Sequence, residues 1–238
     1  MRKVFVLSAL ILIAGFAAAQ AAPTSSSTAA KPAPAQPTAI IDTTAGKMTC
    51  TLFPDKAPIG VANFIGLSNG TKDWKSPTGA TKHGVPLYDG TIFHRVIPEF
   101  MIQGGDPAGT GSGPDPVKAF KNEASKDLLF DKAGRLAYAN AGPNTNSSQF
   151  FITEVPFTGQ QASMLNGNYT IFGQCDEASV ALVKQIAAMS RDSNDRPYRP
   201  IKISHITIQR PGGAAKPATT AAKKPATTTK PSAATPKQ

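Results

Sequence analysis

The sequence predicts a mainly β domain over residues 39–210, a β-barrel or β-sandwich with two added helices. Three observations predict this class: short strand-like runs recur along the region, only two segments have helical periodicity, and the flanking segments 23–38 and 211–238 have no periodic apolar face. About 170 residues are enough to bury close to 70% of the unfolded surface in one core. After an initial hairpin, the strand-like runs cover residues 91–97, 100–104, 134–139, 149–153, 169–174 and 201–209.

The first two elements are a hairpin and a helix. Residues 39–53 predict a β-hairpin because two alternating runs flank turn residues at 44–46. Residues 58–70 predict an amphipathic helix, with Pro58 in the first turn and Gly70 at the stop. One face of this helix carries Val61, Phe64, Ile65 and Leu67.

A second helix and a bulged strand are expected near the end of the domain. Residues 176–189 begin with two acidic residues, which suit a helix N-terminus. In residues 201–209 the apolar positions change phase, which predicts a β-bulge near Ser204-His205. The stripe of the second helix consists of Val180, Val183, Ile186 and Ala187.

The two ends of the chain predict export. Residues 1–22 have a basic start, an apolar run and small residues, the pattern of a secretory signal peptide. The apolar run is shorter than the roughly 20 residues of a membrane span. Residues 23–38 and 211–238 are rich in Pro, Ala, Thr and Lys or Ser, so we expect a disordered linker and tail. The expected location is a periplasm or the outside of the cell.

The net charge of +10 belongs mostly to these ends. Eight of the 25 basic residues and none of the 15 acidic ones lie outside 39–210, which leaves the domain at +2. A domain that is nearly neutral does not indicate specific nucleic-acid binding. The basic tail is either a solvated spacer or a segment that makes weak contact with anionic envelope components.

Only two cysteines are present, Cys50 and Cys175. Export allows a disulfide between them to persist. Both also lie in apolar, strand-like surroundings, where buried free thiols are common. The sequence leaves both possibilities open.

Arg95 is the first candidate for function, because it lies in the largely apolar segment 93–106, FHRVIPEFMIQGGD. An arginine keeps its charge and its five donors, so apolar surroundings are costly unless acceptors meet those donors. The segment predicts either a structural ion pair or a groove that binds carbonyl oxygens.

Two further segments support the groove. Residues 136–153, LAYANAGPNTNSSQFFIT, combine turn and strand chemistry, and residues 165–173 read LNGNYTIFG. With 93–106, these segments closely resemble the cyclophilins, a family of peptidyl-prolyl cis/trans isomerases, over residues 39–209. The resemblance implies a closed eight-stranded antiparallel β-barrel capped by two α-helices, no cofactor, and Pro-containing polypeptides as substrates. We expect a monomer.

The resemblance also implies roles for individual residues. Arg95 is the catalytic donor, and Gln103 positions it and the substrate. His94 supports them as a structural histidine, since the reaction needs no base. The proline pocket and the adjoining peptide groove are expected to consist of Phe100, Met101, Ala139, Asn140, Gln149, Phe151, Met164, Leu165 and Tyr169.

Several positions depart from well-known members of the family. Met164 replaces a tryptophan whose N–H is associated with cyclosporin binding, and Tyr169 replaces a histidine. Residues 70–90, expected to form a surface loop, are longer than in compact members and either shape substrate access or are an inert insertion. The histidines lie on separate segments without the spacing of a metal site.

The function that these observations predict is isomerisation of X–Pro bonds during folding of exported proteins. The alternative is a cyclophilin-like chaperone or binding module that holds Pro-containing segments with little turnover. A basic envelope-attachment protein, which rests on the tail alone, is a third reading.

Overall fold

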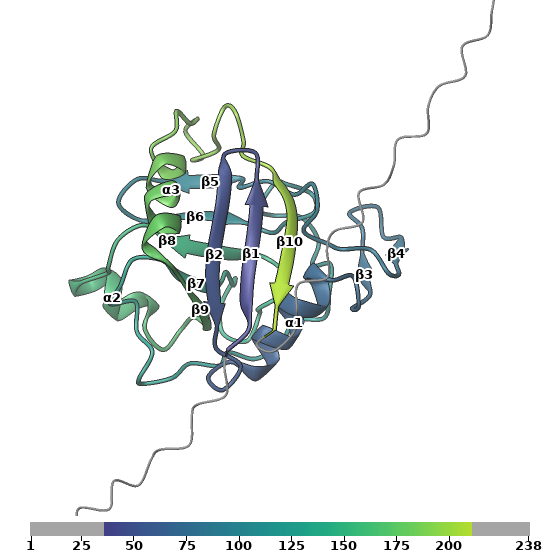
Figure 1. The fold of residues 1–238 in the computed structure, drawn as a ribbon, viewed down its shortest axis with the longest axis horizontal. Helices are drawn as coiled ribbons and strands as arrows, with labels where there is room; N and C mark the ends of the chain where they lie inside the picture. The colour runs from purple at the N-terminus through teal and green to yellow at the C-terminus, as the bar shows by residue number, and fades with distance from the viewer. Residues whose placement is uncertain (1–35, 211–238) are drawn as a thin grey trace, which may run out of the picture. The chain divides into compact units, whose positions relative to one another are not determined.

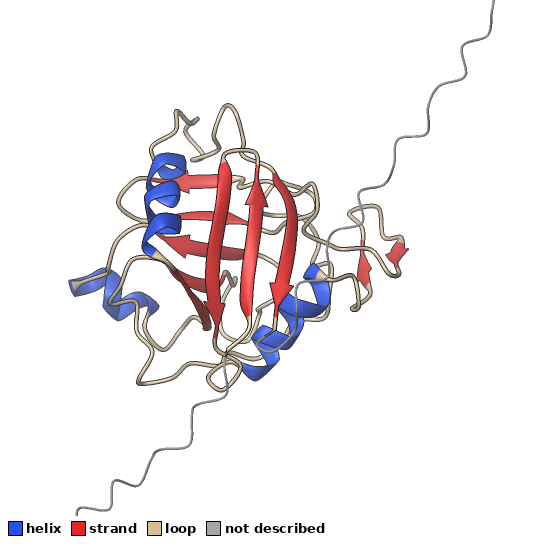
Figure 2. Ribbon diagram, viewed as in Figure 1, coloured by secondary structure: helices blue, strands red, loops and turns tan. Residues whose placement is uncertain are grey.

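The computed structural model describes residues 36–210, which form one large antiparallel sheet, a small two-stranded sheet and three helices (Figures 1 and 2). The predicted signal peptide (1–22), nearly all of the linker (23–38) and the tail (211–238) lie outside the described residues. In spatial order the large sheet contains β10 (Ile203–Gln209), β1 (Thr38–Thr43), β2 (Gly46–Leu52), β9 (Ile171–Cys175), β7 (Arg135–Tyr138), β8 (Phe150–Thr153), β6 (Met101–Gly104) and β5 (Arg95–Ile97).

The sheet is curled into a half-barrel, so the expected closed barrel was wrong. Its two edge strands are β10 and β5, and no ladder joins them. The segments next to these strands are joined by an isolated bridge between Ile92 and Lys202 and by three backbone hydrogen bonds, among them one from the Phe93 N–H to the Ile201 carbonyl at 3.0 Å. Strand β5 has three residues and forms a ladder with β6 on one side.

The predicted hairpin and bulge are confirmed. Strands β1 and β2 pair antiparallel around a turn at 44–45, and β1 pairs with β10 on its other side. The β1–β10 register shifts at Asp42/Thr43, which face His205 and Ile203, so Ser204 is the extra residue. Both Ser204 and His205 are exposed, which explains the change of apolar phase along the strand.

Helix α1 (Pro58–Ser68) follows its prediction closely. Its N-cap, Ala57, offers no side-chain acceptor, but the Glu123 carboxylate accepts the backbone N–H groups of Ile59 and Gly60 at 3.0 and 2.7 Å. A remote side chain therefore satisfies two of the donors that a helix start leaves free. The helix packs against β10.

Helix α3 (Glu177–Ala187) is the second predicted helix. Asp176 caps it by accepting the Ser179 N–H at 2.8 Å, and Val183, Ile186 and Ala187 are buried. The helix packs against β2, β5, β6 and β8, as Figure 1 shows.

The expectation of two helices missed α2 (Gly159–Leu165). This helix has seven residues, and Leu165 is the only buried one, so it has no apolar stripe to detect. A weak signal exists in Thr158 and Gln161, which match the spacing of a capping box, although no side-chain cap bond forms. None of the helices among residues 36–210 is long and apolar enough to cross a membrane.

Residues 70–90 are more ordered than a surface loop. They contain the hairpin β3 (Trp74–Lys75) and β4 (Thr81–Lys82). Trp74 is buried, and its indole N–H donates to the Val85 carbonyl at 2.8 Å. The segment is thus anchored to the core by the tryptophan that the sequence placed in a loop.

A disulfide joins Cys50 on β2 to Cys175 on β9. The two residues lie directly opposite each other in the ladder, and both are buried. The disulfide therefore links two strands that are separated by 125 residues of sequence.

Candidate active site

The register of four neighbouring strands gathers the predicted site residues on one face of the sheet. Arg95 on β5 lies opposite Gln103 on β6, Gln103 lies opposite Phe151 on β8, and Phe151 lies opposite Ala137 on β7. Directly opposed residues point to the same face, as does Met101, two residues before Gln103. The alternate positions fill the main core on the other face: Val96, Ile102, Leu136, Phe150 and Ile152.

The apolar residues of this face form a second hydrophobic cluster, separate from the main core. Phe151 is nearly buried; it stacks on Phe130 with ring centroids 5.7 Å apart and meets Tyr169 edge-on at 5.9 Å. Phe100 packs on Phe157 at 5.2 Å. All the apolar pocket residues expected from the sequence, apart from Met164, belong to this cluster or pack against it: Phe100, Met101, Ala139, Phe151, Leu165 and Tyr169.

Arg95 lies at the edge of this cluster and is partly exposed, with 40% of its side chain accessible. Its Nε lies 3.5 Å from the Asp195 carboxylate. Together with Gln103 it lines a cavity of about 540 Å³, which is also lined by Asp192 and Asn194. The ion pair that the sequence offered as one alternative is therefore present, and Arg95 also lines a cavity.

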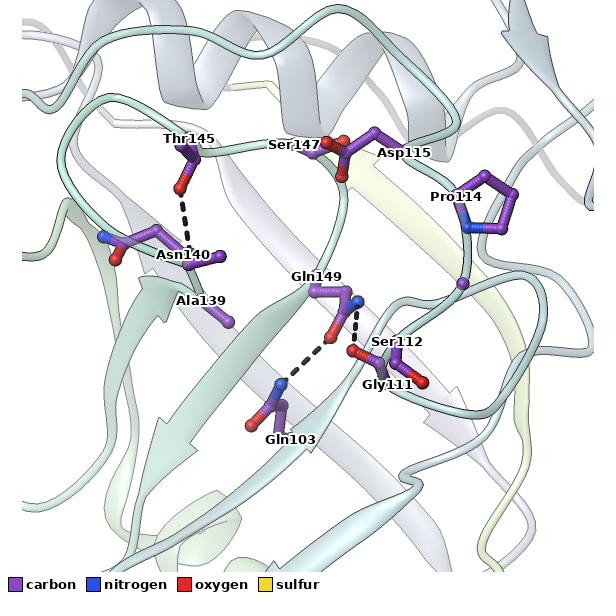
Figure 3. Close-up of a pocket in the computed structure, with 12 residues that line it drawn as sticks. Gln103, Gly111, Ser112, Pro114, Asp115, Ala139, Asn140, Thr145, Ser147 and Gln149 are labelled. Carbon is purple, nitrogen blue, oxygen red and sulfur yellow. Dashed lines mark hydrogen bonds between the residues drawn. The ribbon is translucent and has the colours of Figure 1, made fainter.

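Gln103 and Gln149 form a hydrogen-bonded chain along the groove (Figure 3). The Gln103 amide donates to Gln149 Oε1 at 3.0 Å, and the Gln149 amide donates to the Gly111 carbonyl at 3.1 Å. Because the chain ends on a backbone atom, the orientation of both amides is fixed. The Gln103 amide nitrogen is used in this chain, whereas Gln103 Oε1 takes no part in it.

A second cavity, also of about 540 Å³, adjoins the first at Gln103. Ala139 and Asn140 form one wall and Gly111 lies opposite, as Figure 3 shows. The Asn140 side chain is held by its amide, which donates to the Asn168 carbonyl at 3.0 Å. The two cavities share Gln103, Gly111 and Ser112 and together form one groove.

Met164 and Leu165 are neighbours with opposite surroundings. Leu165 is 8% exposed and belongs to the second cluster, whereas Met164 is 63% exposed at the end of α2. Met164 is therefore on the rim of the site and is the one predicted apolar residue that the structure leaves outside the cluster.

His94 is buried at 5% exposure, and neither ring nitrogen has a hydrogen-bond partner among the described residues. Burial, with smaller effects from the charges of Arg196 and Arg95, lowers the pKa of His94, although Asp106 acts in the opposite direction. The ring lies against Gly111, where an added Cβ would come within 2.9 Å of it. His94 thus supports the turn whose carbonyl holds Gln149.

Asp106 organises the same turn. Its carboxylate accepts the backbone N–H groups of Ala108, Thr110 and Gly111 at 2.8, 2.9 and 2.7 Å. Burial alone would raise the pKa of Asp106, but these three donors outweigh it and hold the pKa below its ordinary value. The carboxylate is therefore charged at neutral pH and fixes the loop over residues 106–111.

Sequence reasoning missed two aromatic residues and one acid. Phe130 and Phe157 support the pocket ring of Phe151, but both lie in irregular segments where no periodicity marks them. Asp195 lies 100 residues from Arg95, within a run of alternating acids and arginines that does not show which pairs form. No cluster of His, Cys, Asp or Glu suited to a metal was found within residues 36–210.

The fold and the site define a mainly β protein whose curled sheet carries a polar groove next to a buried apolar cluster. The groove is lined by amides of fixed orientation and by a guanidinium paired with a carboxylate.

Comparison with known proteins agrees with this class. A family model described as cyclophilin type peptidyl-prolyl cis-trans isomerase/CLD matches residues 38–208. Peptidyl-prolyl cis-trans isomerase A of Mycobacterium tuberculosis is 47% identical over 172 residues, 72% of this chain and 91% of the relative. Peptidyl-prolyl cis-trans isomerase B of Streptomyces anulatus is 42% identical, over 72% of this chain and 95% of the relative. The chain belongs to the cyclophilin-type peptidyl-prolyl cis-trans isomerases.

Solved structures show the same fold. A cyclophilin type isomerase of Cryptosporidium parvum has 32% identity and a TM-score of 0.61, covering 74% of this chain and 98% of its own. A second structure of that protein, determined in the presence of the dipeptide Ala-Pro, has 33% identity and a TM-score of 0.59, covering 73% and 99%.

Proposed function

We propose that this isomerase speeds the folding of exported proteins, and that Arg95 stabilises the twisted X–Pro bond. The observation that carries the proposal is the position of Arg95. Its guanidinium is fixed at the edge of the face that also presents Gln103 and the apolar cluster around Phe151. A proline ring in the cluster would bring its nitrogen near the donors of Arg95.

Isomerisation of an X–Pro bond breaks no covalent σ bond. Rotation about X–Pro faces a barrier of roughly 18–20 kcal/mol because the nitrogen lone pair is delocalised into the carbonyl. In the twisted state that lone pair returns to the nitrogen, which then accepts a hydrogen bond. A donor that binds this state more strongly than the planar one lowers the barrier, and a rate gain of about 10⁵ requires only about 7 kcal/mol.

The remaining residues hold the substrate. We assign Gln103 to positioning Arg95 and the substrate, and Gln149 to the wall of the groove. Asn140 and Ala139 border the adjoining cavity, where the peptide backbone would lie. The related structure determined in the presence of Ala-Pro supports a proline-containing ligand for this groove.

Export rests on the signal-peptide pattern of residues 1–22, and the compartment would be a periplasm or the outside of the cell. The disulfide between Cys50 and Cys175 supports this location, since such bonds persist in oxidising compartments. Expression of the full chain in a bacterial host, followed by fractionation, tests export. Retention of the uncleaved chain in the cytoplasm would argue against it.

The folding role is tested by refolding a secreted protein whose slow phase is limited by X–Pro isomerisation. We expect the wild type to shorten that phase at catalytic concentrations and the Arg95→Ala variant to leave it unchanged. A wild type that binds the unfolded protein without shortening the phase would favour a chaperone or binding module instead.

A further inference from the structure

The loop between α3 and β10 places one carboxylate between two arginines. Asp195 Oδ2 lies 3.5 Å from Arg95 Nε, and Asp195 Oδ1 accepts a hydrogen bond from Arg191 Nε at 3.0 Å. The three side chains are between 31% and 40% exposed. Arg95 is therefore held through Nε, which leaves its two terminal nitrogens available to the groove.

The backbone of this loop is built to hold Asp195 in that position. Asp192 accepts the N–H groups of Asn194 and Arg196 at 2.8 and 2.9 Å, and the Asp195 N–H donates to the Asp192 carbonyl. Asp195 has a φ of 62°, a left-handed conformation that Asn, Asp and Gly adopt most readily. The Asp195 carbonyl in turn accepts the N–H of Val96, the residue after Arg95, at 2.9 Å.

We propose that Asp195 is a positioning residue for catalysis, which holds the Arg95 guanidinium in the orientation that the twisted X–Pro bond requires. The proposal rests on the role proposed above for Arg95. Nothing in the geometry brings Asp195 itself to the substrate. It acts through Arg95, whose long side chain otherwise loses considerable rotamer freedom when it meets the substrate.

The second arginine explains how a carboxylate helps a cationic donor. Alone, Asp195 would neutralise Arg95 and weaken its attraction for the developing lone pair. Arg191 shares the carboxylate, so the group of three keeps a net charge of +1. An ion pair as exposed as this one contributes little to stability, which leaves positioning as its main effect.

The left-handed backbone of Asp195 limits the substitutions that can test this proposal. Asp195→Asn keeps an oxygen acceptor for Arg95 and suits the same φ, while Asp195→Gly keeps the backbone and removes the side chain. Asp195→Ala is avoided because it would strain the backbone. Asp42→Ala is the matched control, since it removes an exposed ion pair between Asp42 on β1 and Lys47 on β2.

The measurement is kcat and KM for isomerisation of a short X–Pro peptide by the full chain, with the melting temperature of each variant. We expect Asp195→Gly to lower kcat about tenfold with KM changed less than twofold, Asp195→Asn to restore most of that loss, and Asp42→Ala to match the wild type. The Nε–H signal of Arg95 in NMR spectra should shift or broaden in Asp195→Gly and recover in Asp195→Asn.

Other outcomes separate this inference from the proposed function. If Arg95→Ala abolishes activity while Asp195→Gly keeps the wild-type kcat, only the inference fails. If Arg95→Ala keeps wild-type activity, the role of Arg95 fails, and with it that of Asp195. A loss in Asp195→Gly that follows the melting temperature and is not reversed by Asp195→Asn would also overturn the inference, because it would show a structural effect.

Discussion

Arg95 and Gln103 lie directly opposite each other on the antiparallel strands β5 and β6, so their side chains point to the same face of the sheet. Gln103 is in turn fixed by Gln149, which is bound to the Gly111 carbonyl. The edge strand therefore carries the cationic donor, while its neighbour carries an amide of fixed orientation beside it. The relationship predicts that the two residues act as a unit on the substrate.

Substitution of Gln103 should impair catalysis without unfolding the protein. Gln103→Ala removes a partly exposed amide and one hydrogen bond, so we expect kcat/KM to fall about tenfold, equivalent to about 1.4 kcal/mol. Peptide isomerisation kinetics check this. Gln185→Ala, an exposed glutamine on α3, is the control and should behave like the wild type. Equal activity in both variants would contradict the role of Gln103.

Cyclosporin should inhibit this isomerase weakly. Met164 is exposed on the rim and has no N–H to donate, unlike the tryptophan of well-known cyclophilins. Met164→Trp adds that donor, and one hydrogen bond should tighten inhibition about five- to tenfold. Ser163→Trp places the same ring on the preceding exposed residue and should change little. Nanomolar inhibition of the wild type would show this expectation to be wrong.

The disulfide should stabilise the fold without contributing to the site. The double variant Cys50→Ala/Cys175→Ala removes a link between strands separated by 125 residues, so the free energy of unfolding should fall by about 2–5 kcal/mol. Denaturant unfolding measures this loss, and mass spectrometry after alkylation with and without reductant confirms the bond in the wild type. Peptide isomerisation by the still-folded variant should be unchanged. A drop in activity with no loss of stability would place the bond in the mechanism.

His94 should make the fold sensitive to mild acid. Its pKa is lowered in the folded state, so below its ordinary pKa of about 6.5 the unfolded chain binds a proton that the folded chain does not. Stability should therefore decrease as pH falls from about 6.5 toward the lower folded-state pKa, and remain level above that window.

His94→Gln should remove this part of the pH dependence, whereas His83→Gln, at an exposed histidine, should retain it. Denaturant unfolding at a series of pH values checks both variants. Peptide isomerisation by His94→Gln should stay within a few-fold of the wild type at neutral pH, since the reaction needs no base. An activity profile that follows a histidine titration and disappears in His94→Gln would instead indicate that His94 acts as a general base.

The sequence predicted local features well, because they depend on nearby residues. The hairpin over β1 and β2, the bulge at Ser204 and the starts of α1 and α3 all follow from turn residues, caps and apolar phase. Whether the barrel closes could not be predicted in this way, since closure depends on how far the two edge strands overlap. The short helix α2 was missed because its seven residues bury only Leu165.

In the site, too, the residues that could be predicted differ from those that depend on tertiary packing. The resemblance to cyclophilins named residues that the register does bring to one face, among them Arg95, Gln103 and Phe151. The residues that hold them in place were not visible. Asp195, which pairs with Arg95, lies in a loop 100 residues further along the chain. Phe130, which stacks on Phe151, lies in an irregular segment. Such partners are chosen by tertiary packing, which leaves no periodic signal in the sequence.

The central claim is that a fixed guanidinium at position 95 stabilises the twisted X–Pro bond. The most direct test is kcat/KM for a short X–Pro peptide, measured for the wild type, Arg95→Lys and Arg95→Ala, with unfolding curves for all three. Removing a fixed donor typically costs about 10²–10³ in rate, so Arg95→Ala should lose at least 100-fold with its stability nearly unchanged, and Arg95→Lys should recover only part of the loss. An Arg95→Ala variant that is folded and as active as the wild type would contradict the account.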